Sequence, residues 1–307
     1  MSFDLIFCSP NKDGVNALSL FEYFRSRPNM KCTMKNDSFE VMYENQRTGV
    51  YCSFYYEPIN NENDIPSDIS EKGATGLSVS INYGRPSFFA HELMPLIVEL
   101  CNFNNLLILD PQEEDGGSPK ICVVSELIES WENINATMAI PAAIKSHFQP
   151  PFMDKEKALF LWKYMMISET LEKRLVTEDI FVPKMIVINR LPDIPLETAI
   201  TWTNGIPTVL PQCDIVILQK IHSKGFFGIG RREEIGWIKY ETVVESIRPY
   251  LNRFTIKKPS IYEVQVLFSK NSERVREILL ELPLEGSLYS LEGVAMDGFI
   301  DYKIEGE

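Results

Sequence analysis

A run of carboxylates behind a short apolar segment is the first feature of the sequence that could do chemistry. The run follows residues 106–109 and precedes two glycines; it consists of Asp110, Glu113, Glu114 and Asp115. Carboxylates at the carboxyl end of a strand could bind Mg²⁺ or Ca²⁺. Their spacing fits no EF-hand loop, and charge runs mostly face solvent. We therefore interpret the run as a solvated acidic turn or as a patch that binds a protein, and we expect no metal.

The three histidines carry no catalytic signature. They are His91, His147 and His222. His91-Glu92 begins like the zinc motif H-E-x-x-H, but position 95 is proline, so the second ligand is missing. A Ser-His-Asp triad meets only in space and stays open, although no G-x-S-x-G segment marks a nucleophile. An exposed or structurally hydrogen-bonded histidine is the simpler interpretation.

The glycine-rich segment 225–232 has the composition of a phosphate loop but not its context. A phosphate loop ends in a helix whose N-terminus faces the anion, whereas this segment leads into a strand. The pattern predicts a long hairpin between residues 214–221 and 235–240. Aromatic residues next to arginine near such a tip are typical interface anchors, and the alternative is a loop tucked inward. The residues concerned are Phe226, Phe227 and Arg231.

Residues 77–112 contain the elements that must position the acidic turn. Residues 77–81 alternate between apolar and polar, which predicts a strand, and apolar residues at helical spacing then predict a helix ending near Asn104-Asn105. Ser87 is the predicted cap of this helix, and Pro95 predicts a bend or a restart. The short apolar run 106–109 predicts a central strand, so the order indicates a β-α-β unit.

The whole chain predicts an α+β protein of two domains, 1–150 and 151–307. The first domain has the expected order β-α-β-β-β-β-α-β. The Pro150-Pro151 pair marks the boundary, and Asp154 caps a long connecting helix that opens the second domain. Each domain is expected to have a mixed or antiparallel sheet with helices mainly on one face.

Composition excludes several protein classes. The 307 residues are 45% hydrophobic and 24% charged, as in soluble globular proteins. No apolar run reaches the roughly 18 to 20 residues that span a bilayer, and the N-terminus lacks the features of a signal peptide, so we expect a cytoplasmic protein without membrane contact. Six scattered cysteines form no C-x-x-C pair, which indicates structural thiols rather than a zinc site or a redox motif. The sequence contains no cofactor fingerprint, so we expect no bound cofactor.

The net charge of −13 favours a protein partner of opposite charge. Because 43 acidic residues face only 30 basic ones, the chain lacks the basic surface that a nucleic-acid backbone requires. An acidic surface is compatible with solubility alone. It is also compatible with a basic protein partner, because complementary fields speed encounter.

In class and charge, the chain resembles bacterial toxin-immunity proteins. Residues 82–89, NYGRPSFF, and residues 107–112, LILDPQ, resemble segments of uncharacterised bacterial proteins. The resemblance implies a non-enzymatic protein that neutralises a basic toxin domain by direct contact, and type VI secretion immunity is the specific expectation. The residues expected to touch the partner are Asp110, Glu113, Glu114, Asp115, Phe226, Phe227 and Arg231.

Two other classes of function stay open on the sequence alone. One is a hydrolase or nucleotide-processing enzyme with its site in the interdomain cleft, using His91, Glu92 and the acidic turn. The other is a structural adaptor. The gene neighbourhood separates them, because a toxin or secretion gene immediately upstream supports immunity and a metabolic operon supports an enzyme.

Overall fold

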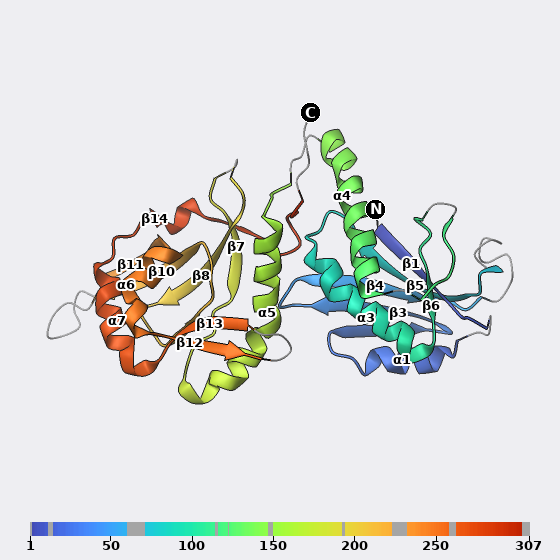
Figure 1. The fold of residues 1–307 in the computed structure, drawn as a ribbon, viewed down its shortest axis with the longest axis horizontal. Helices are drawn as coiled ribbons and strands as arrows, with labels where there is room; N and C mark the ends of the chain where they lie inside the picture. Colours follow the sequence, from blue (N-terminus) through green and yellow to red (C-terminus); the bar gives the residue numbers. More distant parts are fainter. Residues whose placement is uncertain are drawn as a thin grey trace. The chain divides into compact units, whose positions relative to one another are not determined.

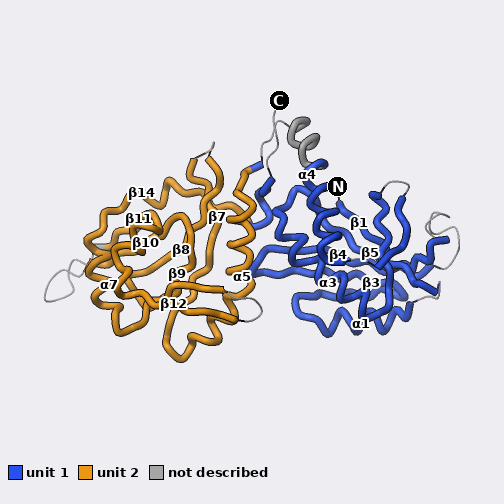
Figure 2. Tube along the Cα trace, viewed as in Figure 1, with its two compact units in different colours: residues 1–150, 296–307 blue, residues 151–295 orange. Residues whose placement is uncertain are grey.

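The chain folds into two compact units, which Figure 2 shows in different colours. Unit 1 comprises Met1–Pro150 and Met296–Glu307, and unit 2 comprises Pro151–Ala295. The structure is a computed structural model, and it describes residues 2–11, 15–59, 71–113, 116–121, 123–146, 150–191, 194–222, 232–257 and 262–302. Unit 2 begins at the expected proline pair. It does not run to the C-terminus, because the last residues group with unit 1.

Unit 1 is built on a six-stranded sheet in the order β2-β3-β4-β5-β1-β6. Every neighbouring pair is antiparallel. Alternating burial along each long strand reflects the two-residue period of the sequence, so one face of the sheet enters the core. The strands are β1 (Ser2–Cys8), β2 (Met30–Lys35), β3 (Ser38–Asn45), β4 (Val50–Tyr56), β5 (Ala74–Asn82) and β6 (Leu107–Leu109).

The β-α-β unit expected from residues 77–112 is present, with β1 inserted into it. Both β5 and β6 pair antiparallel with β1, so they run parallel to each other on its two sides. The prediction of a central strand at 106–109 was wrong, because β6 is an edge strand. Its Ile108 and Leu109 are nevertheless buried, which explains why the run is as apolar as a central strand.

Among the described residues of unit 1, three long helices accompany this sheet (Figure 1). They are α1 (Ala17–Arg25), α3 (Phe88–Asn104) and α4 (Val124–Ser146). Phe24 of α1 packs against Phe54 of β4 at a ring-centroid distance of 4.9 Å, and Trp131 of α4 is fully buried. Pro95 lies inside α3, which continues through it as a single helix and ends at Asn105 in the left-handed conformation. Together with the α+β order of unit 1, these elements confirm the predicted fold class.

The start of α3 differs from the prediction. Ser87 makes no side-chain capping bond to the helix. Instead, its N–H donates to both carboxylate oxygens of Asp301 at 3.0 Å, and its hydroxyl donates to Oδ2 of Asp301. Phe299 packs against Phe88 with ring centroids 6.2 Å apart. The segment at 299–302 completes the core of unit 1 and contains no strand among its described residues.

The described part of unit 2 combines two sheets with three α-helices. The larger sheet has the order β14-β11-β10-β8-β7-β15, and the smaller has the order β12-β13-β9. Asp154 caps α5 as predicted, by accepting a hydrogen bond from the N–H of Glu156 at 2.9 Å. The elements are α5 (Lys155–Leu175), η2 (Val176–Glu178), β7 (Met185–Asn189), β8 (Glu197–Thr203), β9 (Thr208–Leu210), β10 (Ile215–His222), β11 (Arg232–Lys239), α6 (Tyr240–Ile247), η3 (Arg248–Tyr250), β12 (Leu251–Ile256), β13 (Tyr262–Leu267), α7 (Ser269–Glu281), β14 (Gly286–Ser287), η4 (Leu288–Ser290) and β15 (Glu292–Val294).

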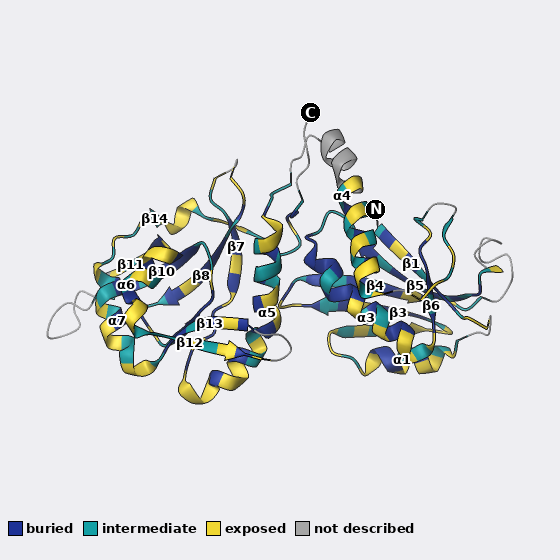
Figure 3. Cartoon of the chain, in the orientation of Figure 1, coloured by how far each residue is buried: buried dark blue, intermediate teal, exposed yellow. Residues whose placement is uncertain are grey.

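The segment after α7 crosses one face of the larger sheet. It pairs with β11 through β14 and with β7 through β15, so it joins opposite edges of the sheet. Between them, Leu291 packs on a buried cluster that includes Ile217 and Trp237. The indole N–H of Trp237 donates to Ser290 Oγ at 3.1 Å, and the Arg190 guanidinium lies 4.9 Å from the centroid of its ring. In each unit, the buried residues gather where other elements face a sheet (Figure 3).

Replacing Asp301 with alanine is expected to destabilise unit 1. The substitution leaves the buried N–H and hydroxyl of Ser87 without their acceptor, at a cost of about 3 kcal/mol. Hydrogen exchange at the amides of α3 measures this loss within unit 1 alone.

Asp297→Ala is the matched control. Arg85 donates to the main-chain carbonyl of Asp297, while the carboxylate lies 3.8 Å away and is partly exposed, so the cost should stay below about 0.5 kcal/mol. Equal protection losses in the two variants would show that the Asp301 contact does not stabilise α3.

Candidate functional site

The acidic turn is anchored by Asp110, which is only 4% exposed. Its Oδ1 accepts hydrogen bonds from the N–H of Gln112 at 2.9 Å and from Nε2 of Gln112 at 2.7 Å. Its Oδ2 accepts a bond from Ser130 Oγ at 3.2 Å. Gln112 in turn bonds to the main-chain N–H and carbonyl of Asp4. Asp110 was predicted to contact a partner at the surface, but it is buried and ties the turn to β1 and α4.

Two lysines contact the rest of the turn, Lys120 through an ion pair and Lys72 through hydrogen bonds. Glu113 Oε1 lies 2.5 Å from Lys120 Nζ, and Lys72 Nζ donates to the carbonyls of Gly116 and Gly117 at 3.0 and 2.8 Å. Gly117 has a φ of +61°, and a Cβ at this position would lie 2.6 Å from the Asp110 carbonyl oxygen. A residue with a side chain is therefore excluded there. The predicted contact residues Glu114 and Asp115 lie outside the described residues.

The predicted hairpin in unit 2 is present. Strands β10 and β11 pair antiparallel from Ile215↔Lys239 to His222↔Arg232. The connection between them lies outside the described residues. It contains the remaining predicted contact residues, Phe226, Phe227 and Arg231.

His91 and Glu92 do not form a common acid–base site. Glu92 is buried, and its Oε1 accepts hydrogen bonds at 2.7–3.0 Å from three side chains near the β3–β4 turn, those of Tyr43, Asn45 and Thr48. Burial raises the pKa of Tyr43, and the charge of Glu92 raises it further. His91 instead faces α4, with its Nε2 3.5 Å from Glu132 Oε1. Adjacent residues on a helix point in different directions, and here they serve different contacts.

The loop from Tyr83 to Ser87 is held by residues distant in sequence. Asn135 makes two hydrogen bonds to this loop. Its Oδ1 accepts one from the Gly84 N–H at 2.7 Å, and its Nδ2 donates the other to the Arg85 carbonyl at 2.9 Å. The Arg85 guanidinium donates to Tyr51 Oη at 2.7 Å and to the Asp297 carbonyl at 2.9 Å. Sequence reasoning missed this cluster, because no local pattern connects residues that are 34 and 212 positions apart. These contacts hold the loop in place and leave Arg85 little freedom to bind a ligand.

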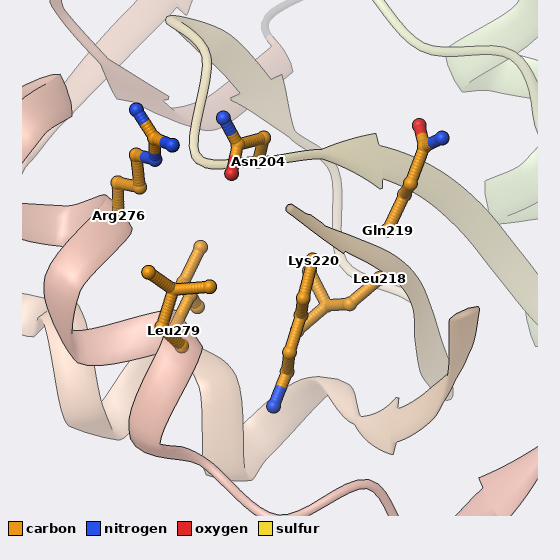
Figure 4. A pocket seen from close by; sticks show the side chains of 7 residues that line it. Asn204, Leu218, Gln219, Lys220, Arg276 and Leu279 are labelled. Carbon is orange, nitrogen blue, oxygen red and sulfur yellow. The ribbon is translucent and has the colours of Figure 1, made fainter. Parts of the chain in front are cut away.

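Unit 2 contains a small cavity beneath α7 (Figure 4). Its volume is about 10 Å³, which has room for one water molecule but not for a substrate. Lys220 of β10, which is 3% exposed, lines the cavity and directs its Nζ away from Asn204 and Arg276 (Figure 4) to donate to the Leu282 carbonyl. Burial lowers the pKa of Lys220. Through its hydrogen bond to the Leu282 carbonyl, Lys220 stabilises the C-terminal end of α7.

A shallower groove of about 380 Å³ lies on another part of unit 2. Its floor includes Cys213, whose thiol donates to the Ile215 carbonyl at 3.3 Å. Burial raises the pKa of this thiol, so it stays protonated rather than forming the thiolate that a nucleophile requires. Arg253 and Glu263 at the rim lie 3.5 Å apart and compensate each other's charge. The lining residues are Leu210, Gln212, Cys213, Tyr240, Glu241, Val244, Arg253, Glu263, Val264 and Gln265.

Comparison of the chain with protein-family models, with curated proteins and with solved structures finds no match. Within the described part of the chain, no three His, Cys, Asp or Glu side chains gather as metal ligands would. None of the helices in that part has both the length and the apolar character needed to cross a membrane.

Asp110 is expected to make stability depend on pH. Burial raises its pKa above the ordinary value of 3.8, so the folded protein holds this proton more tightly than the unfolded chain does. The resulting stabilisation is complete below pH 3.8 and is lost as the pH rises through the folded-state pKa. Asp110→Asn keeps an acceptor for Gln112 and cannot titrate. As the pH rises from 3.8 through the folded-state pKa, the free energy of unfolding of the wild type should therefore fall relative to that of this variant. Urea titrations at several pH values measure this difference.

Glu40→Gln is the control, because Glu40 is an exposed carboxylate of β3, which lies on the other side of the sheet from β6 and Asp110. This control variant should show the same pH dependence of its free energy of unfolding as the wild type between pH 3.8 and the folded-state pKa of Asp110. A parallel pH profile for wild type and Asp110→Asn would contradict the assignment.

Proposed function

We propose that this chain is a non-enzymatic cytoplasmic protein that neutralises a basic toxin domain by direct contact, as an immunity protein of a type VI secretion system does. The observation that carries the proposal is the unequal division of charge. Unit 1 contains 24 acidic and 11 basic residues, whereas unit 2 contains 19 of each, so the whole net charge of −13 belongs to unit 1.

Most of this charge is available to a partner. Among the described acidic residues of unit 1, Glu92, Asp110 and Asp301 are buried and hydrogen-bonded, and the others are exposed or partly exposed. Surface charge of one sign attracts an oppositely charged protein over a distance of about one Debye length, roughly 8 Å at physiological ionic strength. Because unit 2 carries no net charge, this attraction acts on unit 1.

The contacts of the buried carboxylates support binding over catalysis. A catalytic acid or base must reach a substrate atom, but Glu92 and Asp110 are directed at protein groups that hold their turns together. Their role is to fix the loops of unit 1 in one arrangement. A fixed surface loses less conformational entropy on association, which benefits a tight inhibitor.

Co-expression with the product of the adjoining upstream gene tests the proposal. The chain should restore growth to cells that make that product, and the two purified proteins should associate at least about 10-fold more slowly at 0.5 M than at 0.05 M salt, because screening removes the steering field. Stopped-flow fluorescence measures the rates. Cell death despite expression of the folded chain, or an association rate independent of salt, would refute the proposal.

A double substitution tests the enzymatic alternative. His91→Ala with Glu92→Gln removes the imidazole and the carboxylate charge but keeps an acceptor for Tyr43, Asn45 and Thr48. Protection in the growth assay should stay within a few-fold of wild type. A loss of about 100-fold or more, with an unchanged unfolding midpoint, would indicate catalysis by these residues.

A further inference from the structure

Three apolar side chains of unit 1 are more than half exposed at the end of α3 and the start of α4. Phe103 is 68% exposed, Ile121 is 78% exposed and Val123 is 54% exposed. Single exposed apolar residues are common, but neighbouring ones mark interaction surfaces. We call these three residues the α3–α4 patch.

The contacts between the two helices place these residues at the same end of unit 1. His91 near the start of α3 faces Glu132, and Asn135, one turn further along α4, holds the loop that precedes α3. The two helices are therefore antiparallel, and the end of α3 lies towards the start of α4. Lys120 and Ile108 exchange both main-chain hydrogen bonds, an antiparallel bridge that puts Ile121 beside Leu107, shortly after α3.

Contacts within unit 1 hold the side chain of Phe103 in place. Its ring lies 4.9 Å from the ring of Tyr23, measured between centroids, and the Arg27 guanidinium covers Tyr23 at 4.6 Å. Arg27 is fixed in turn by Glu99, with 2.7 Å between the charged atoms. An aromatic side chain that is both exposed and fixed loses little freedom on binding, which is the property of an interface anchor.

Acidic residues border the patch. Glu126 and Glu129 are exposed on the first turns of α4. Nearby, Glu113 is paired with Lys120 and Glu99 with Arg27, so Glu126 and Glu129 supply the unbalanced negative charge of the rim. From Val124 to Ser146, the only basic residue of α4 is Lys145, near its far end. An apolar centre with an acidic rim is complementary to an apolar surface bordered by lysine and arginine.

We infer that the α3–α4 patch is the surface through which unit 1 binds a basic protein. This inference rests on the proposed function and assigns its site. The partner contributes an apolar contact that covers Phe103, Ile121 and Val123, with lysine or arginine side chains that face Glu126 and Glu129. The net charge of unit 1 favours such a partner over a second copy of this acidic chain.

Binding kinetics with the product of the adjoining upstream gene test the site. Phe103→Ala combined with Ile121→Ala should raise the Kd about 30-fold or more, mainly through faster dissociation, because anchors act after encounter. Glu126→Gln combined with Glu129→Gln should slow association about 3-fold to 10-fold at low salt and have no effect at high salt. Tyr289→Ala is the matched control, since Tyr289 is a fully exposed aromatic residue of unit 2, and it should bind as the wild type does.

The outcomes separate the site from the function. If the wild type binds and both patch variants keep wild-type rates, with α3 protected from hydrogen exchange, the patch is not the interface while the proposed function stands. If the wild type does not bind, the proposed function is wrong and the patch assignment fails with it. If the wild type sediments as a dimer that Phe103→Ala with Ile121→Ala dissociates, the patch joins two copies of this chain and the inference is overturned.

Discussion

The carboxylate of Asp301 at the start of α3 is the contact on which unit 1 depends. A buried carboxylate is stable only when hydrogen bonds replace its water, and Ser87 supplies them through its N–H and its hydroxyl. The negative charge also lies at the positive end of the helix dipole. Once α3 starts at this point, Glu92 meets the β3–β4 turn and His91 meets α4. The contacts of α3 with α4 keep the two helices antiparallel, which places the α3–α4 patch at one end of unit 1.

Local patterns were sufficient to predict most elements but not their long-range partners. The alternation in β5, the apolar stripe of α3 and the Asp154 cap of α5 depend on neighbouring residues, and the structure contains all three. Ser87 looked like a cap because serine usually fills that role alone, whereas its partner lies 214 positions away. The edge position of β6 also depends on a segment that is distant in sequence. β1, from the start of the chain, occupies the place inside the sheet that the run at 106–109 was expected to take.

The sequence predicted the acidic character of the candidate site but not its location in the fold. Total charge is a property of the sequence, but its assignment to unit 1 required knowing that the last residues return there. Asp110 looked solvated because acidic turns usually are, and only the fold shows that Gln112 and Ser130 enclose it. The exposure of Phe103 could not be predicted either, because its apolar side chain fits the same helical period as the buried residues of α3.

The return of the chain to unit 1 also determines when that unit can finish folding during synthesis. A ribosome makes the strands and helices of unit 1 first, but Asp301 emerges only after the whole of unit 2 has been translated. At roughly 5 to 20 residues per second, the 214 residues between Ser87 and Asp301 take on the order of 10 to 40 seconds. Throughout that interval, Phe88 lacks the cover of Phe299, and α3 lacks its carboxylate. The nascent unit 1 therefore exposes apolar surface that is buried in the finished protein, and a ribosome that stops before codon 301 leaves the unit incomplete.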